Sequence, residues 1–214
     1  MRQRASRRAR QPLSVLGRAM ACLLVAGCAA GPVPDVYVLG DAPAAASAIR
    51  PQSGLPVVDI KPVRIPDYLD TTDLVVRTDG RVIVSRSGRW GERLSTGITR
   101  ALVAALGARL PHMVVTSMPQ TERPAWQLLL DVAAFEARSD GRVVLVADWT
   151  VVDSMGCTAA SARVSLTEPV GHRGDAAIVA AMTRGVDALA SDIAGAIDRA
   201  SAKTRGARTG RCRT

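Results

Sequence analysis

WQLLLDVAAFEARSDGRVVLVADWTVVDS, residues 126–154, holds two alternating apolar runs separated by Ser139-Asp140-Gly141. Alternation of apolar and polar residues is typical of a half-buried strand, and Asp-Gly between two such runs is typical of a hairpin turn. The stretch therefore predicts a long β-hairpin. The next segment, TAASARVSLTE at 158–168, predicts a third antiparallel strand.

Shorter strands are predicted on the N-terminal side of this hairpin. DVYVL (35–39) is short and alternating, and LPVVDIKPVRIP (55–66) contains a proline that places it at a sheet edge or a bulge. DLVVRTDGRVIVS (73–85) predicts a second hairpin that turns at its Asp-Gly pair. HMVVTSM (112–118) predicts one further short strand.

Two segments change from the period of a strand to that of a helix. Residues 90–110 and 175–201 both carry apolar side chains at steps of three and four. Such a stripe is typical of an amphipathic helix that packs on a sheet. We therefore predict an α+β domain of two layers, an antiparallel-rich sheet of about six strands with both amphipathic helices packed on one face.

The formal charge of +9 is carried by the two ends of the chain. Residues 1–27 hold six arginines and residues 201–214 hold five basic residues, with no acidic residue in either segment. Residues 28–200 hold 17 basic and 19 acidic residues, a net charge of −2. Nucleic-acid binding needs a dense basic face and stacking aromatics, and aromatic residues are only 3% of the chain. The sequence therefore predicts no nucleic-acid partner.

Residues 1–27 have the build of a bacterial export signal. An arginine-rich start precedes the apolar residues 19–27, which are too few to span a bilayer core that takes about 20 residues in a helix. VAGC (25–28) resembles the lipobox at which lipoproteins are acylated on cysteine and cleaved. The resemblance implies that Cys28 becomes the acylated first residue of the mature chain. An ordinary signal peptide with a chance cysteine is the alternative.

The residue after Cys28 bears on the choice of membrane. In lipoproteins of bacteria with two membranes, an aspartate there tends to retain the protein at the inner membrane, and this chain has Ala29. The lipobox resemblance therefore implies an outer-membrane lipoprotein whose domain faces the periplasm.

These features divide the chain into four parts. Residues 1–27 are the signal peptide, and 28–54 are a lipidated N-terminus and flexible tether that is rich in alanine, proline and glycine. Residues 55–200 are the folded domain. Residues 201–214 are a small, polar and basic tail that we expect to be disordered.

Few residues in the mature chain suit catalysis or metal binding. Cys157 and Cys212 form a disulfide in an oxidising compartment or remain two free thiols, and their spacing from His112 and His172 does not match a zinc site. The motifs of hydrolase nucleophiles, P-loops, zinc proteases and dinucleotide sites are absent from the sequence. We therefore predict no catalytic residue, no metal and no cofactor.

Three motifs follow one another along the predicted domain: VRIPDYLD (63–70), LVVR (74–77) and RWGERL (89–94). In this order and spacing they resemble the signature of the PqiC-like auxiliary lipoproteins of ABC-type and MCE-type transport systems. The resemblance covers the lipobox and most of residues 33–200. It implies structural roles for the motif residues Arg64, Pro66, Arg77, Arg89 and Trp90. It also implies that the Arg-Trp segment opens the first helix, where we expect the indole to pack on the sheet.

The resemblance implies an accessory subunit and not an enzyme. PqiC-like proteins are outer-membrane lipoproteins that act with periplasm-spanning MCE-type proteins, which are thought to move lipids or other hydrophobic molecules between the two membranes. The chain would hold or receive the outer end of that conduit, and its small-residue helices are compatible with a homo-oligomer. The alternative is an outer-membrane assembly lipoprotein that chaperones a barrel or lipopolysaccharide component.

The loop after the first core strand is the candidate partner-contact surface. Loops on a rigid scaffold commonly carry recognition, and Tyr68 and Leu69 suit docking on an apolar surface. Asp67 and Asp70 would then set orientation by charge. A structural role is the alternative, in which Tyr68 caps the core and Asp70 caps the turn that follows.

Overall fold

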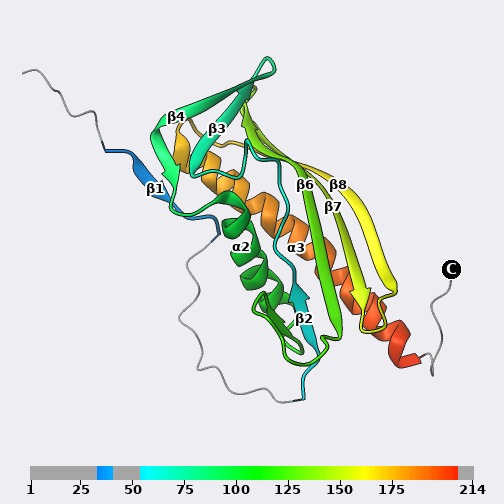
Figure 1. Cartoon of the computed structure of the whole chain (residues 1–214). Helices are drawn as coiled ribbons and strands as arrows, with labels where there is room; N and C mark the ends of the chain where they lie inside the picture. The colour runs from blue at the N-terminus through cyan, green and yellow to red at the C-terminus, as the bar shows by residue number, and fades with distance from the viewer. Residues whose placement is uncertain (1–32, 41–53, 207–214) are drawn as a thin grey trace, which may run out of the picture. The chain divides into compact units, whose positions relative to one another are not determined.

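The long hairpin predicted from residues 126–154 forms the middle of the sheet (Figure 1). The structure, a computed structural model, describes residues 33–40 and 54–206. β6 (Trp126–Arg138) pairs antiparallel with β7 (Arg142–Asp153), and β7 pairs antiparallel with β8 (Thr158–Pro169). These three strands are long because alternation continues through each of them and every turn between them contains a glycine at positive φ.

The other edge of β6 is shared by two shorter strands that run parallel to it. β2 (Val57–Ile60) pairs with the start of β6, and β3 (Asp73–Thr78) pairs with its end. β5 (Val114–Thr116) extends the sheet beyond β2. The chain between β2 and β3 therefore crosses alongside β6, where it makes one isolated bridge to that strand.

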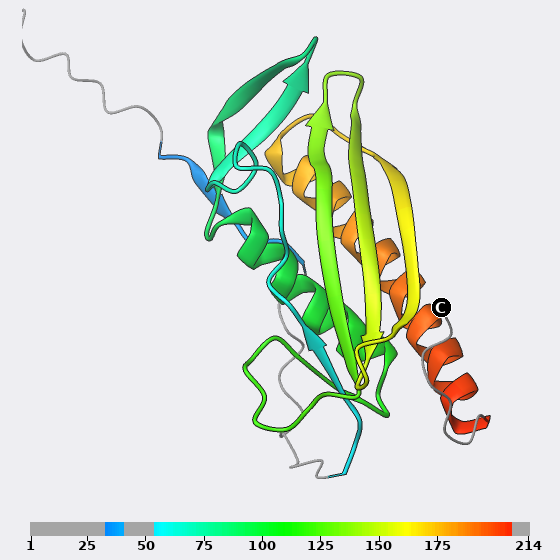
Figure 2. The ribbon, with the colours of Figure 1, turned by 45° about the vertical axis from the view of Figure 1, so that its right-hand side comes forward.

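A second hairpin and the N-terminal strand extend the sheet beyond β3. β4 (Arg81–Trp90) pairs antiparallel with β3, and the two turn residues Asp79 and Gly80 both have positive φ, as predicted for a two-residue hairpin loop. β1 (Asp35–Tyr37) pairs parallel with β4. The β3–β4 hairpin projects beyond the helices at one end of the molecule (Figure 2).

Both helices lie on the same face of the sheet (Figure 1). α3 (Asp175–Gly206) packs on β6, β7 and β8, and α2 (Leu94–Arg109) packs on α3 and β5, so the apolar stripes of both helices enter one hydrophobic core. The core residues that carry this contact include Leu94, Ile98, Leu102, Leu106, Leu128, Leu130, Phe135, Leu145, Leu189, Ile193 and Ile197. Burial of each such side chain contributes about 1.5–3 kcal/mol, so this face holds the two layers together.

The predicted fold class is confirmed as α+β with two helices and a multistranded sheet, but the sheet differs in detail. Within residues 33–40 and 54–206 it has eight strands, not six. Four of its seven strand pairings are parallel, although the longest pairings are antiparallel. The parallel pairs join segments distant in sequence, so no turn motif announces them.

Three element boundaries also differ from the predictions. The compact unit begins at Pro34, not at residue 55, because β1 is part of the sheet and Leu39 is only 1% exposed. Trp90 ends β4 and does not open the helix, which begins at Leu94. α3 runs to Gly206, so the first residues of the tail that we expected to be disordered are helical.

Candidate functional site

The loop at 66–70, which holds the predicted contact residues, folds into a tight turn between β2 and β3 and meets the start of α2. The backbone N–H groups of Leu69 and Asp70 both donate to the carbonyl oxygen of Pro66, at 2.9 Å and 3.1 Å. The turn directs Leu69 into the core, where it is only 1% exposed. The prediction that Leu69 contacts a partner is therefore wrong, because a buried side chain presents no surface to dock on.

Tyr68 lies over β6 and β3 in a cluster with Arg77 and Glu136, here called the Tyr68 cluster. The Tyr68 hydroxyl donates to Glu136 Oε2 at 3.0 Å and accepts from Arg77 Nη2 at 2.7 Å. Arg77 Nε also donates to Glu136 Oε1. The Arg77 guanidinium lies over the Tyr68 ring, with Cζ 5.2 Å from the centroid, which adds a cation–π contact.

Burial makes these three groups depend on one another. The Glu136 side chain is 2% exposed and the Arg77 side chain 31%, so the carboxylate has almost no access to water and relies on its two partners. Burial and the hydrogen bond to Glu136 raise the pKa of Tyr68, and the hydrogen bond to Glu136 raises the pKa of Arg77. Tyr68 and Arg77 therefore keep their protons, and the cluster acts as a fixed polar platform, with Tyr68 still 37% exposed.

Asp70 caps the start of α2, although it lies 25 residues before Ser95 in the sequence. Its Oδ1 accepts from the Ser95 backbone N–H at 3.2 Å, and its Oδ2 pairs with Arg93 Nη2 at 3.0 Å. Burial acts to raise the pKa of Asp70, but the hydrogen bonds from Ser95 and Arg93 outweigh it, and the pKa lies below its usual value. A carboxylate at the positive end of α2 is thus a structural cap, and the docking role predicted for it is not needed to explain it.

Of the four predicted contact residues, Asp67 and Tyr68 remain at the surface. They are adjacent in the turn, so they present one acidic and one aromatic side chain together. This pair, together with the exposed edge of Arg77 on β3, forms the surface that a partner could contact.

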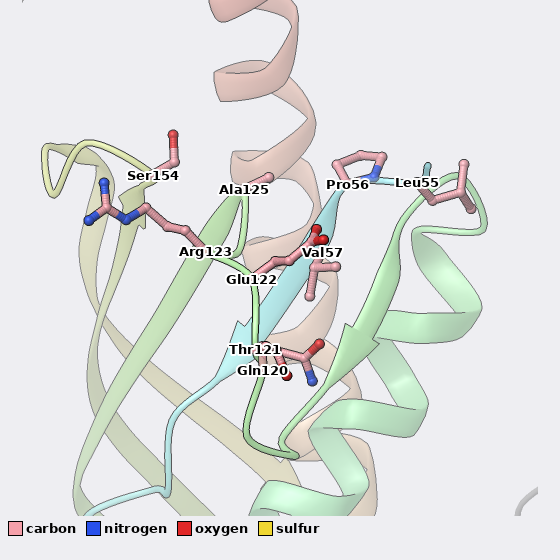
Figure 3. Close-up of a pocket in the computed structure, with 9 residues that line it drawn as sticks. All are labelled: Leu55, Pro56, Val57, Gln120, Thr121, Glu122, Arg123, Ala125 and Ser154. Carbon is pink, nitrogen blue, oxygen red and sulfur yellow. The ribbon is translucent and has the colours of Figure 1, made fainter. Parts of the chain in front are cut away.

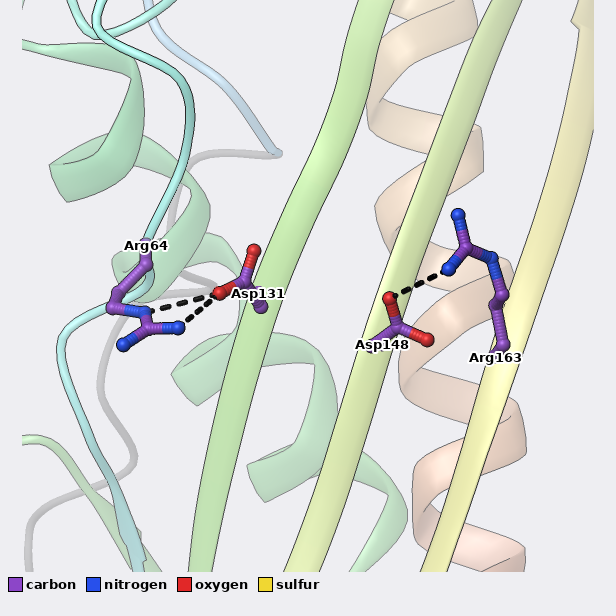
Figure 4. Close-up of polar contacts among 4 residues, drawn as sticks. All are labelled: Arg64, Asp131, Asp148 and Arg163. Atoms are coloured by element: carbon purple, nitrogen blue, oxygen red, sulfur yellow. Dashed lines mark hydrogen bonds and ion pairs between the residues drawn. The ribbon is translucent and has the colours of Figure 1, made fainter.

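The family-motif arginine Arg64 takes part in a charged row across the open face of the sheet. Asp131 on β6 lies opposite Asp148 on β7, which lies opposite Arg163 on β8. Arg64 Nε donates to Asp131 Oδ2 at 3.0 Å, and Arg163 Nη1 donates to Asp148 Oδ2 at 3.3 Å (Figure 4). The four side chains are between 49% and 81% exposed, so each ion pair contributes roughly 0–1 kcal/mol to folding. The row is a polar surface and not a buried support.

The last two motif residues have different environments. Trp90 is 4% exposed, and its backbone N–H donates to the Thr72 carbonyl at 2.7 Å. Arg89 is exposed beside it. The Trp90 indole is buried in the hydrophobic core, as expected, but it is carried by β4 and not by the first helix.

Two neighbouring surface depressions lie at the other end of the sheet from the β3–β4 turn. One of about 570 Å³ is lined by the start of β2, the segment 120–125 and the β7–β8 turn (Figure 3). A neighbouring one of about 590 Å³ adds Asp59 and Lys61, whose carboxylate and ammonium groups are 2.7 Å apart. Both are open grooves lined by polar, charged and apolar side chains. The sequence did not indicate them, because the 117–125 segment has no motif of its own.

The other predicted positions are covered only in part. Cys28 and Cys212 lie outside the described residues, whereas Cys157 is disulfide-bonded and its backbone N–H donates to Asp153 Oδ1 at 2.8 Å. In residues 33–40 and 54–206 no three metal-ligating side chains gather in one place. No helix in that part of the chain is both long and apolar enough to cross a bilayer.

Comparison with known proteins identifies the family. The model of the ABC-type transport auxiliary lipoprotein component family matches residues 37–194. The chain belongs to this family. The match begins inside β1, which agrees with the place of β1 in the sheet, and it covers both contact-loop residues and the Tyr68 cluster.

Relatives and solved structures agree with this assignment. The chain is 28% identical over 131 residues to the Intermembrane transport lipoprotein PqiC of Escherichia coli and to that of Shigella flexneri, which covers 61% of this chain and 70% of each relative. The crystal structure of an uncharacterized protein superposes with a TM-score of 0.66 at 23% identity over 77% of this chain and 99% of that one. A Xanthomonas campestris protein gives 0.61 at 17% identity over 81% and 98%. These two structures show the same fold.

Sequence reasoning missed Glu136. It lies on an apolar strand in the run AAFEAR, and a single glutamate in such a run signals a buried acid with a cationic partner. The β-bulge between Val132 and Ala134 then decides which face it takes. Local alternation does not reveal a bulge, so the pairing with Arg77 could not be deduced from the pattern.

Proposed function

We propose that this chain is an outer-membrane-anchored periplasmic accessory subunit of an MCE/Pqi-type system that moves lipids or other hydrophobic molecules between the inner and outer membranes. The family match over residues 37–194 carries the proposal. The printed name of the PqiC relatives, intermembrane transport lipoprotein, supports the transport role. The family is one of transport auxiliary components and not of enzymes, so ATP hydrolysis would belong to another subunit.

The anchor in this proposal is acylated Cys28. It ends the motif VAGC and is followed by Ala29, the combination that favours the outer membrane. Pro34 begins the compact unit, so only a few residues separate the acyl chains from the sheet. We also propose that Cys212 pairs with Cys157, which would tie the end of the chain to the β7–β8 turn.

The contact surface in this proposal is the pair Asp67 and Tyr68 on the open face. The Tyr68 cluster fixes the aromatic ring before a partner arrives, so little side-chain entropy is lost on docking. The neighbouring charged row gives the same face two adjacent carboxylates with an arginine at each end, which suits orientation of a partner more than tight binding. A periplasm-spanning MCE-type protein is the proposed partner.

The anchor is tested by palmitate labelling in cells. We expect the wild-type chain and a Cys22→Ser control to be labelled and membrane-bound, because residue 22 is removed with the signal. We expect Cys28→Ser to lose both properties. A labelled, membrane-bound Cys28→Ser protein would refute the lipoprotein assignment.

The partner is tested by photo-cross-linking in cells from position 68, with position 118 as an exposed control on another loop. We expect an MCE-type component to be recovered from position 68 and not from position 118. Recovery of a barrel protein or lipopolysaccharide-assembly component with no MCE-type protein would contradict the transport role and favour the assembly alternative.

A further inference from the structure

Three connections meet at one end of the sheet, here called the hairpin end: the β3–β4 turn at 79–80, the β6–β7 turn at 139–141 and the β8–α3 loop at 171–174. Arg77 of β3 is in register with Arg138 of β6, and the Ser139 N–H donates to the Arg77 carbonyl at 3.2 Å. The Val170 N–H donates to the Gly141 carbonyl at 2.9 Å. The connections are therefore neighbours in space, and Figure 2 shows them at one end.

The β3–β4 hairpin exposes a continuous apolar run at this end. Val82, Ile83 and Val84 are 40%, 51% and 47% exposed. Because successive side chains of a strand point to opposite faces, Val82 and Val84 occupy one face of the hairpin and Ile83 the other. An apolar side chain on both faces of a projecting hairpin suits insertion into an apolar medium more than packing against one flat partner.

Basic residues surround this apolar run. Arg81, Arg86, Arg138 and Arg173 are exposed. Among the described residues near them, the acids that have no ion pair are exposed Asp79 and half-buried Asp175, which accepts from Ser85 and Ser87 at 2.7 Å. Arg142 is paired with Asp140, at 2.6 Å. The hairpin end therefore carries positive charge although residues 28–200 have a net charge of −2. An apolar tip inside a basic ring matches the chemistry of an anionic lipid surface.

The direction of β1 shows from which side the chain enters the described part of the domain. β1 runs parallel to β4, with Asp35 opposite Gly88, so the chain approaches β1 from the direction of the hairpin end. Cys28 lies six residues before Pro34, a span of at most about 20 Å for an extended chain. The part of β4 between Arg81 and Gly88 extends about 23 Å. A membrane anchor at Cys28 is therefore compatible with a hairpin tip that reaches the same bilayer.

We propose that the hairpin end is a second membrane contact, with Val82, Ile83 and Val84 inserted among the headgroups of the anionic lipid surface that holds acylated Cys28. The proposal deepens the proposed function and rests on the acylation of that cysteine. Two contacts, one covalent and one from the fold, fix the domain's tilt on the membrane, which a lipid anchor alone does not do.

The test places a tryptophan at the tip of the acylated, full mature chain. Ile83→Trp and the control Met118→Trp, which is 71% exposed on the loop after β5, are bound to vesicles of phosphatidylethanolamine and phosphatidylglycerol with brominated acyl chains. The three native tryptophans are no more than 5% exposed and give a constant background. Bromine quenches only an indole that enters the bilayer. We expect the added signal of Ile83→Trp to fall by about half and that of Met118→Trp to be unchanged.

A second measurement uses the mature chain with Cys28→Ser, which lacks acyl groups. We expect it to bind the same vesicles weakly, and Ile83→Asp in that background to lower the binding constant about tenfold. Unquenched Ile83→Trp on an acylated, vesicle-bound chain would overturn the hairpin contact and leave the lipoprotein assignment intact. A changed sedimentation coefficient of Ile83→Asp without any change in lipid binding would also overturn it, because the tip would then contact a second copy. Absence of acyl groups on Cys28 would instead contradict the proposed function.

Discussion

Removing the charge of Glu136 should lower the free energy of unfolding more than removing the charge of an exposed acid on the same face. Glu136→Gln keeps the shape of the side chain but exchanges one acceptor oxygen for an amide that faces Arg77 and Tyr68. Glu136 accepts two hydrogen bonds, one of them from a cation, and its side chain is 2% exposed. Hydrogen bonds to charged groups contribute about 1.5–3 kcal/mol each, and the glutamine retains part of this. We therefore expect a loss of about 2–3 kcal/mol of unfolding free energy, or roughly 5–10 °C in Tm.

Asp148→Asn is the matched control. Asp148 occupies the neighbouring strand on the same face and also pairs with an arginine, but its side chain is 50% exposed. Water replaces its contact, and its loss relieves the like charge of Asp131 opposite, so we expect a change within about 0.5 kcal/mol. Urea unfolding followed by the fluorescence of the buried tryptophans measures both variants.

A double-mutant cycle separates the cluster from a simple effect of burial. Tyr68→Phe and Glu136→Gln remove opposite partners of one hydrogen bond, so the double variant should lose less than the two single losses added, with a coupling of about 1 kcal/mol. Equal losses for Glu136→Gln and Asp148→Asn, or additive losses in the cycle, would refute the idea that burial makes the Tyr68 cluster interdependent.

Three further variants test the contact loop and its surroundings by the same unfolding assay. The pKa of Asp70 lies below its usual 3.8, so its carboxylate stabilises the fold above that pH. Asp70→Asn should lower the free energy of unfolding by about 1 kcal/mol at pH 7. The difference in unfolding free energy from wild type should fade as the pH falls below about 4. A difference independent of pH would contradict the cap. Leu69→Ala should cost about 2–5 kcal/mol and Asp67→Ala less than about 0.5, and the reverse order would mean that the loop packs otherwise. Gly88→Ala should cost about 1–3 kcal/mol because its Cβ would lie 2.6 Å from a carboxylate oxygen; an unchanged midpoint would show that the oxygen moves away easily.

The sequence predicted the parts of the fold that are specified locally. The hairpin of β6 and β7 follows from alternation and an Asp-Gly turn, and both helices follow from steps of three and four. The pairings of β2 and β3 with β6 are parallel and join segments about 60 residues apart, so side-chain pattern alone does not select them. The strand predicted at 35–39 is present as β1, but three residues carry too little signal to place it inside the domain, and burial of Leu39 against α2 does so.

The candidate site was predicted less well than the fold, and for a physical reason. A loop motif identifies which residues lie in a turn, but the turn geometry decides which of them face outward. Residues 67–70 form one tight turn, in which neighbouring side chains face different ways. Tyr68 faces the open side of the sheet and Leu69 faces the core. Family motifs therefore identified the loop correctly and left the choice between contact and support to the three-dimensional structure.

The position of the Tyr68 cluster relative to the hairpin end constrains how a partner would approach. Arg77 lies one residue from the end of β3, and Glu136 lies two residues from the end of β6, so the cluster is close to the β3–β4 and β6–β7 turns. With the hairpin end on the membrane, Asp67 and Tyr68 would lie near the lipid surface and face sideways across the open side of the sheet. A partner that docks there must reach the level of the headgroups. The terminal part of a conduit that delivers hydrophobic cargo to the membrane meets that requirement, whereas a partner confined to the middle of the periplasm does not. Cross-links from position 68 that were confined to segments of the partner near the inner membrane would contradict this orientation.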